Sequence, residues 1–364
     1  MASKNVSNNF LAAIAIPPGE TIHEYMDYLG MNQQELAVRL EVSVKHLNNI
    51  LNGKSPITYE TALKLETVIG PSAEFWMNLE SQYQLNKARL EKEAEMLDDK
   101  IIVQQFPYKK MSDYGWVEAV TDRIERVINL RKFFGVATLS AIKPSYQVQY
   151  RKQKAISQID DYSVLAWLRQ ATLAGNELNV KEFNKTKLKA LIPTFRQLTN
   201  SSPETFFPEI QKLCSECGVA LVLVEDLPKT YICGATIWSN NYAILALSVR
   251  GKKADKFWFT FFHELAHLIH HSKNSAHVHY QGNNDEEEAE ADLIASNYLI
   301  PNVQYNKFIS NKFNIDKSDI IEFAKEVEIH PCIVLGRLKH DRIVDFSRYN
   351  ELVPSFVIVR NKKR

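Results

Sequence analysis

The segment Phe261 to Ile269 reads Phe-Phe-His-Glu-Leu-Ala-His-Leu-Ile, and it constrains the fold more than any other part of the chain. Its apolar residues predict a buried helix. His263 and His267 stand four residues apart, so both imidazoles lie on one helical face, where they can bind one zinc ion. Glu264 lies beside the first imidazole and can act as general base. Unpaired polar groups in a buried helix cost about 1–3 kcal/mol each, which argues against a chance match.

A catalytic zinc site needs a third protein ligand and one open coordination position. The segment Glu288 to Asp292, on the next predicted helix, begins 21 residues after His267. We predict that Glu288 is the third ligand, and Glu287 remains the alternative. Asp292 lies one turn beyond Glu288 on the same face and is predicted to orient a ligand imidazole through its free N–H.

Further histidines surround this motif. His271 falls near the face of His267, so we predict that it supports the metal site from behind a ligand, contacts the substrate or stabilises an oxyanion. The alternative is that His271 is a partly exposed polar residue beside a cleft. The same interpretation covers His270, and also His277 and His279 in the predicted loop before the helix that contains Glu288.

The order of the predicted elements indicates a multidomain fold with three parts. Residues 1–95 read as short amphipathic helices, an all-α N-terminal domain, and residues 96–212 as a helical linker or dimerisation region. Residues 213–364 read as an α+β domain. We expect its strands at 219–224, 231–238 and 242–249, and its helices from about 255 and over 286–299, 304–312, 317–327 and 331–339. The second strand is also a candidate for pairing with an extended peptide substrate.

Composition restricts the protein class and the compartment. The chain has 364 residues, 45% hydrophobic and 24% charged, which is typical of folded globular domains. It lacks a secretory signal and any apolar run of the ~18 residues that a membrane span needs, so we expect a cytoplasmic protein with no membrane partner. Its four cysteines are too few for a disulfide framework. The pair Cys214 and Cys217 has no second pair to complete a zinc site, and we interpret it as a helix end leading into a strand.

Residues 215–305 resemble the ImmA/IrrE family of metallopeptidases. The resemblance lies in the strand from Val219, the segments 255–267 and 288–292, and the helix end at Tyr298 to Pro301. It implies a zincin-like domain in which His263, His267 and Glu288 bind Zn²⁺ and Glu264 is the catalytic acid/base. Members of the family cleave helix-turn-helix repressors. Ala266 stands where the family often has Gly, and Ile294 where it often has Phe, and neither change touches the metal chemistry.

The N-terminal domain resembles the HigA-type antitoxins of the Xre-like helix-turn-helix family. The matching segments are residues 16–20, 31–37 and 42–54. Asn32 and Ser43 are suitable helix N-caps, and the resemblance implies that the helix after Ser43 reads a major groove. The expected contacts with bases come from Val44, Lys45, His46 and Asn49, and those with phosphates from Gln33, Gln34 and Lys54.

Charge leaves an alternative open for this domain. Residues 1–95 carry 8 Lys and Arg against 12 Asp and Glu, a net of −4, which is unfavourable for phosphate contact. We therefore expect local contacts with operator DNA by a homodimer, and the alternative is a helical module that binds proteins only.

Two functions from different classes follow. The first is a DNA-bound regulator whose zinc endopeptidase cleaves a repressor or partner protein. The second is a HigA-like antitoxin that represses its operon and neutralises a toxin, with the zinc domain as sensor or scaffold. The intact Glu264 favours the enzyme, because a scaffold needs zinc ligands but no general base.

Overall fold

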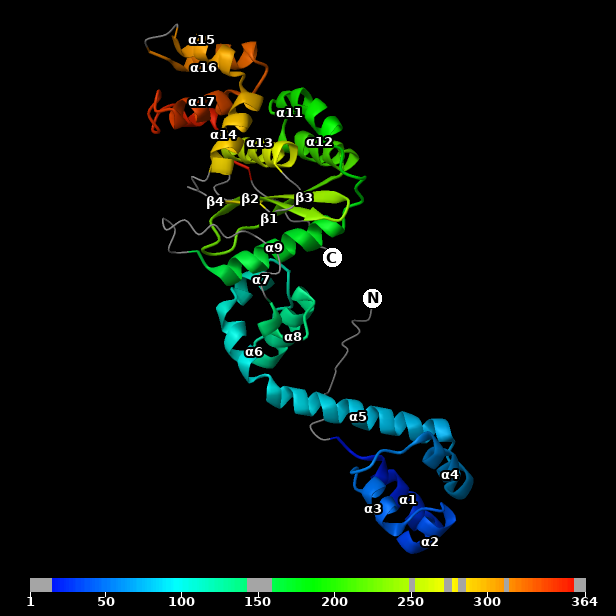
Figure 1. The fold of residues 1–364 in the computed structure, drawn as a ribbon. Coiled ribbons are helices and arrows are strands. Elements are labelled where there is room, and N and C mark those ends of the chain that lie inside the picture. The colour runs from blue at the N-terminus through cyan, green and yellow to red at the C-terminus, as the bar shows by residue number, and fades with distance from the viewer. Residues whose placement is uncertain are drawn as a thin grey trace, which may run out of the picture. The chain divides into compact units, whose positions relative to one another are not determined.

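The computed structural model describes residues 15–142, 159–248, 253–271, 277–280, 286–310 and 314–356. The chain divides into two compact units, Met1–Lys100 and Ile101–Arg364. Figure 1 shows helices in the described part of the first unit, and a small sheet with helices in the second. The predicted multidomain organisation, with a helical N-terminal part and an α+β C-terminal part, is confirmed.

The N-terminal unit is a small helical domain with its own core. Its helices are α1 (Pro18–Leu29), α2 (Gln33–Arg39), α3 (Val44–Leu51), α4 (Tyr59–Ile69) and α5 (Ala73–Glu95), followed by α6 (Leu97–Ile102) at the boundary. The buried side chains include Leu36, Leu47 and Trp76, none more than 1% exposed. Asn32 and Ser43 cap α2 and α3 as expected, since their side chains accept hydrogen bonds from the backbone N–H of Glu35 and His46.

The second unit begins with helices. These are η1 (Val103–Gln105), α7 (Tyr108–Asp113), α8 (Arg123–Phe134), η2 (Leu139–Ala141), α9 (Asp161–Asn176), α10 (Lys185–Ala190), α11 (Ile192–Leu198) and α12 (Pro203–Glu216). Side chains of α10 to α12 share one hydrophobic cluster with the later helices, and Phe195 meets Phe261 edge to face. Residues on both sides of position 212 thus contribute to one core, and the three-part division at 95 and 212 stays a prediction.

The sheet has the order β1-β3-β2-β4. Its strands are β1 (Val219–Val224), β2 (Ile232–Ser239), β3 (Tyr242–Ser248) and β4 (His277–Tyr280). β1 runs parallel to β3, whereas β2 is antiparallel to both β3 and β4. The first three strands match the predicted ones to within one residue, whereas β4 lies in a segment for which the sequence analysis predicts a loop. That prediction is wrong: residues 277–280 alternate polar and apolar side chains, but this run has only the minimum length that indicates a strand, and the alternation was overlooked.

Helices cover both faces of this sheet. In Figure 1, α9 lies under the sheet and α13 (Ala254–His270) lies over it. The later elements are α14 (Glu286–Leu299), α15 (Asn302–Ser310), α16 (Lys317–Glu326), α17 (Pro331–His340) and η3 (Asn350–Leu352). The bounds of α14 to α17 agree with the predicted helices to within about two residues, whereas η3 was not predicted. Because α13 lies between the sheet and the C-terminal helices, it is the central element of the core.

The structure also bears on two further predictions, one about the cysteine pair and one about membrane-spanning helices. Cys214 and Cys217 are buried at the end of α12, and Gly218 turns the chain into β1 with φ 76°, so the pair is the helix end that the sequence predicted. Among the helices that the structure describes, we find none with the length and apolar character that membrane crossing requires.

Candidate metal centre and nucleic-acid interface

Three polar side chains of α13 lie inside the core. His263 and Glu264 are 0% exposed and His267 is 2% exposed. The helical period brings the two imidazoles onto one face, with their Nε2 atoms 2.9 Å apart. Apolar side chains of the same helix, such as Phe262 and Leu265, are buried beside them.

Glu288, from the first turn of α14, completes a cluster with these imidazoles. Its Oε2 lies 3.2 Å from His263 Nε2 and its Oε1 lies 3.3 Å from His267 Nε2. Glu288 is 6% exposed, whereas Glu287 is exposed. Of the two carboxylates that the sequence offered as third ligand, the structure brings Glu288 to the histidines.

The donor set suits zinc. Two imidazole nitrogens and one carboxylate oxygen lie within 4.8 Å of one another. Ligand atoms at 2.0–2.2 Å from a tetrahedral zinc ion lie roughly 3.2–3.6 Å from each other, close to the observed separations. Three protein ligands would leave the fourth position open, as in catalytic zinc sites.

Each imidazole has a partner at its other nitrogen. His263 Nδ1 lies 2.7 Å from Asp292 Oδ1, and His267 Nδ1 lies 2.7 Å from His271 Nδ1. If the Nε2 atoms face a metal, both Nδ1 atoms carry hydrogen and donate, which orients the rings. His271 Nε2 then carries a hydrogen as well, and it lies 3.6 Å from Glu290 Oε2. The structure thus brings Asp292 to His263 and His271 to His267, and adds Glu290 behind His271.

The side chain of Glu264 is held by the sheet. Thr236 Oγ1 of β2 donates a hydrogen bond of 2.8 Å to Glu264 Oε2, and Thr236 is 1% exposed. Gly234, on the same face of β2, faces the other oxygen so closely that an added Cβ would lie 2.6 Å from Glu264 Oε1. Sequence reasoning missed both residues, because nothing in the local pattern connects β2 with a helix that follows much later.

The other three histidines that the sequence analysis singled out are not part of the metal cluster. His270 Nε2 lies 2.8 Å from the hydroxyl of Tyr298. Partial burial, with Lys189 and Lys185 nearby, lowers the pKa of His270. His277 and His279 belong to β4, which pairs with β2. Because β3 occupies the other side, β2 is an inner strand of the described sheet and not the peptide-binding edge suggested by its sequence.

The expected DNA contacts all come from α2, α3 and the turn after α3. Glu41, at φ 56°, turns the chain between these helices. The predicted phosphate contacts, Gln33 and Gln34, open α2, and Lys54 follows α3. The predicted base contacts are on the side of α3 away from its core, with Val44 44% exposed, Lys45 and His46 exposed, and Asn49 half-buried.

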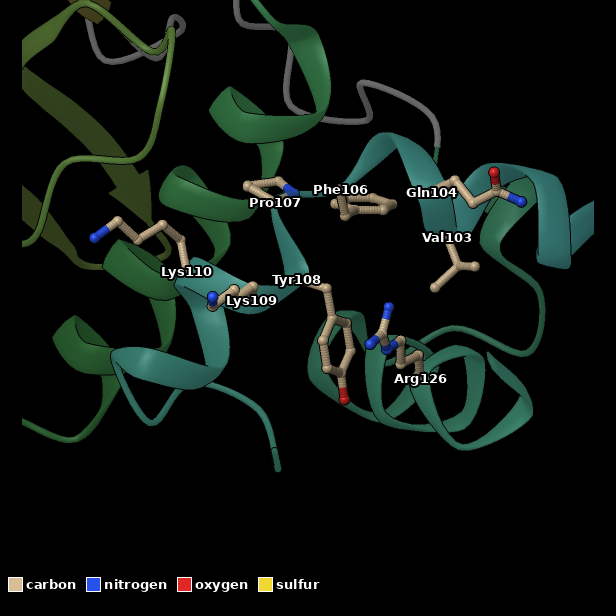
Figure 2. A pocket seen from close by; sticks show the side chains of 8 residues that line it. All are labelled: Val103, Gln104, Phe106, Pro107, Tyr108, Lys109, Lys110 and Arg126. Atoms are coloured by element: carbon tan, nitrogen blue, oxygen red, sulfur yellow. The ribbon is translucent and has the colours of Figure 1, made fainter. Parts of the chain in front are cut away.

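The second unit also has a pocket of about 400 Å³, which Figure 2 shows from close by. Cationic side chains contribute to its lining, and one of them, Arg126, donates from Nε to Val120 O and lies 5.3 Å from the Tyr108 ring. Its lining residues are Val103, Gln104, Phe106, Pro107, Tyr108, Lys109, Lys110 and Arg126. None of them belongs to the cluster on α13 and α14.

Two known families match separate parts of the chain. Residues 218–339 match the IrrE N-terminal-like domain of the Peptidase M78 family. Residues 22–76 match the helix-turn-helix family. The first range contains every residue of the metal cluster as well as Gly234 and Thr236, and the second contains all of the expected DNA contacts.

Similar proteins cover the N-terminal part. The uncharacterized HTH-type transcriptional regulator YddM of Escherichia coli K12 is 37% identical over 71 residues, 20% of this chain and 76% of that protein. Virulence-associated protein I of Dichelobacter nodosus is 36% identical over 81 residues, 22% of this chain and 75% of that protein.

Solved structures similar to this chain include an addiction module antidote protein of a HigA family from Coxiella burnetii. It is 34% identical, with a TM-score of 0.22, and the match covers 22% of this chain and 90% of the other. The Pseudomonas aeruginosa antitoxin HigA with the higBA promoter is 30% identical, with a TM-score of 0.22, and that match covers 23% and 94%.

Proposed function

Because this chain belongs to the helix-turn-helix transcriptional regulators and carries an IrrE-like domain of the Peptidase M78 family, we propose that it is a DNA-binding regulator with a zinc endopeptidase. Its substrate would be a repressor or partner protein. The observation that carries the proposal is the convergence of His263, His267 and Glu288 beside the buried carboxylate of Glu264. A merely structural zinc site has no need of that fourth group.

The residues divide the chemistry among them. His263, His267 and Glu288 would hold the ion, and Asp292 and His271 would keep the two imidazoles in the required tautomer and orientation. Bound zinc supplies Lewis acidity, which polarises a peptide carbonyl and lowers the pKa of water toward ~7. Glu264 accepts a proton from the attacking water and delivers it to the nitrogen of the leaving amine. The peptide bond is thereby hydrolysed to a carboxylic acid and an amine.

Replacing Glu264 by Gln tests this function. The amide has nearly the shape of the carboxylate and leaves the three ligands in place, but it cannot accept the proton. We expect Glu264→Gln to keep one zinc per chain by elemental analysis, and hydrolysis of a quenched fluorogenic peptide library to fall about 100- to 10,000-fold. His263→Ala serves as the control that loses both metal and hydrolysis. A Glu264→Gln variant equal to wild type would favour the scaffold alternative.

The N-terminal unit would bring this activity to operator DNA, as a dimer. Support comes from the helix-turn-helix match and from the exposure of Lys45 on a helix with an ordered N-cap. We expect Lys45→Ala and Asn49→Ala each to weaken operator binding by about 1–3 kcal/mol, measured by anisotropy at fixed salt. Lys87→Ala, at an exposed position of α5, is a control for loss of one positive charge. Unchanged affinity in the double variant would favour a protein-binding module.

A further inference from the structure

Strand β2 presents two unusual residues to the helix that carries Glu264. Gly234 and Thr236 are two positions apart, so they lie on the same face of the strand, the face toward α13. Thr236 Oγ1 donates to Glu264 Oε2 at 2.8 Å. Both side chains are buried, with Thr236 1% and Glu264 0% exposed. A buried hydrogen bond therefore joins the sheet to the helix, and its acceptor is the carboxylate of Glu264.

Gly234 determines the space available to the other oxygen. A Cβ at this position would lie 2.6 Å from Glu264 Oε1 and 2.9 Å from Thr260 Cγ2. Both distances are too short for non-bonded atoms. The nearest atom is the end of a flexible side chain, so the carboxylate would move before the backbone does. Only glycine at position 234 leaves Glu264 in its present rotamer.

The strand that carries Gly234 and Thr236 lies inside the described sheet. β2 is bonded on both sides, with Thr236 opposite Leu245 of β3 and opposite His277 of β4. Glu264, by contrast, carries its carboxylate on three rotatable side-chain bonds. A hydroxyl on a doubly paired strand is thus a suitable fixed point for orienting the carboxylate.

We propose that Gly234 and Thr236 are positioning residues for the general base. Thr236 holds one carboxylate oxygen of Glu264 by its hydroxyl, and Gly234 leaves room for the other, so that the carboxylate is aimed at the reacting water. This proposal rests on the endopeptidase function proposed above. It assigns no direct chemistry to either residue, and it predicts a loss of turnover rather than of metal or substrate binding.

The main test compares Thr236→Val with Thr236→Ser in the zinc-loaded full-length chain. Valine keeps the shape and removes the hydroxyl, whereas serine keeps the hydroxyl. With the fluorogenic peptide that wild type cleaves fastest, we expect valine to lower kcat about 10- to 100-fold with KM nearly unchanged, and serine to restore most of it. Zinc content should be equal in all variants. Gly234→Ala should also lower kcat without loss of zinc.

Thr230→Val is the matched control. Thr230 is likewise a 1% exposed threonine of this unit, and its hydroxyl donates to Leu227 O at 2.9 Å, away from Glu264. We expect it to have wild-type kcat. Equal losses in Thr230→Val and Thr236→Val, or failure of serine to rescue, would overturn the positioning role in favour of general destabilisation.

A second measurement does not depend on turnover. Acetohydroxamate is a small acid that binds zinc and can also hydrogen-bond to a correctly placed Glu264 carboxylate. Its Kd, measured by isothermal titration calorimetry, therefore reports the orientation of that carboxylate. We expect Thr236→Val to raise this Kd about tenfold, and Thr236→Ser and Thr230→Val to leave it unchanged. If wild type binds the hydroxamate but cleaves no peptide, the endopeptidase function fails, and the Kd values still decide the positioning role. Equal Kd values in wild type and Thr236→Val would overturn it.

Discussion

Single residues around the metal cluster differ in what they contribute, and Asp292 is an informative case. Its carboxylate accepts from His263 Nδ1 at 2.7 Å, yet 43% of its side chain is exposed. Partial exposure to solvent weakens the electrostatic attraction between Asp292 and His263, but the hydrogen bond still orients the imidazole ring of His263.

Removing this carboxylate should therefore weaken metal binding without abolishing it. We expect Asp292→Ala to lower zinc affinity about 10- to 100-fold, measured by competition with a chelator of known affinity. Glu287→Ala, an exposed position in the first turn of the same helix, should bind zinc as wild type does. Equal affinities in the two variants would argue against an orienting role for Asp292.

Among the helices, α17 carries a titratable N-cap. His330 Nδ1 accepts a hydrogen bond of 3.1 Å from the backbone N–H of Cys332, and only the neutral ring can accept it there. Burial lowers the pKa of His330. The folded state therefore resists protonation more than the unfolded chain, so the cap's contribution to stability is present above the ordinary histidine pKa of about 6.5.

Because the pKa of His330 is lower in the folded state, the protein should lose stability as the pH falls below the ordinary histidine pKa. We expect the free energy of unfolding of the zinc-saturated chain to decrease between about pH 7 and pH 5, partly because of His330. Asn is a suitable cap that does not titrate, so His330→Asn should reduce this dependence in urea titrations. His340→Asn, at the exposed end of the same helix, should leave it unchanged. Identical pH profiles for wild type and His330→Asn would contradict the prediction.

At the scale of the whole molecule, the two units have separate hydrophobic clusters, and among the described residues the metal cluster belongs to the second unit. The ion would link α13 to α14 through three side chains. Metal that binds the native state alone stabilises it by mass action, by about 2.7 kcal/mol at a free concentration 100 times Kd.

Zinc removal should accordingly act on one unit. In scanning calorimetry of the full chain with excess EDTA, we expect the transition of the C-terminal unit to move to lower temperature and that of the N-terminal unit to stay in place. Restoring zinc should reverse the shift. A shift of both transitions by the same amount would mean that the units unfold together.

Local periodicity explains what the sequence determined by itself. The spacing of His263 and His267 follows from the helical repeat, so the pair and the adjacent Glu264 were identifiable before any fold was known. The strands at 219–224 and 242–248 and the caps Asn32 and Ser43 were predictable for the same reason, since each depends on residues close in the chain.

Tertiary contacts decided the rest. The choice of Glu288 over Glu287 depends on how α14 is rotated against α13, because adjacent helical residues point about 100° apart. The short strand β4 has only four residues, so its pairing with β2 was needed to identify it. Thr236 lies 28 residues before Glu264, and no local signal connects them. Their contact arises only when the sheet packs on the helix. For this reason the histidine pair could be predicted from spacing, whereas the hydrogen bond that holds the Glu264 carboxylate could be found only in the tertiary structure.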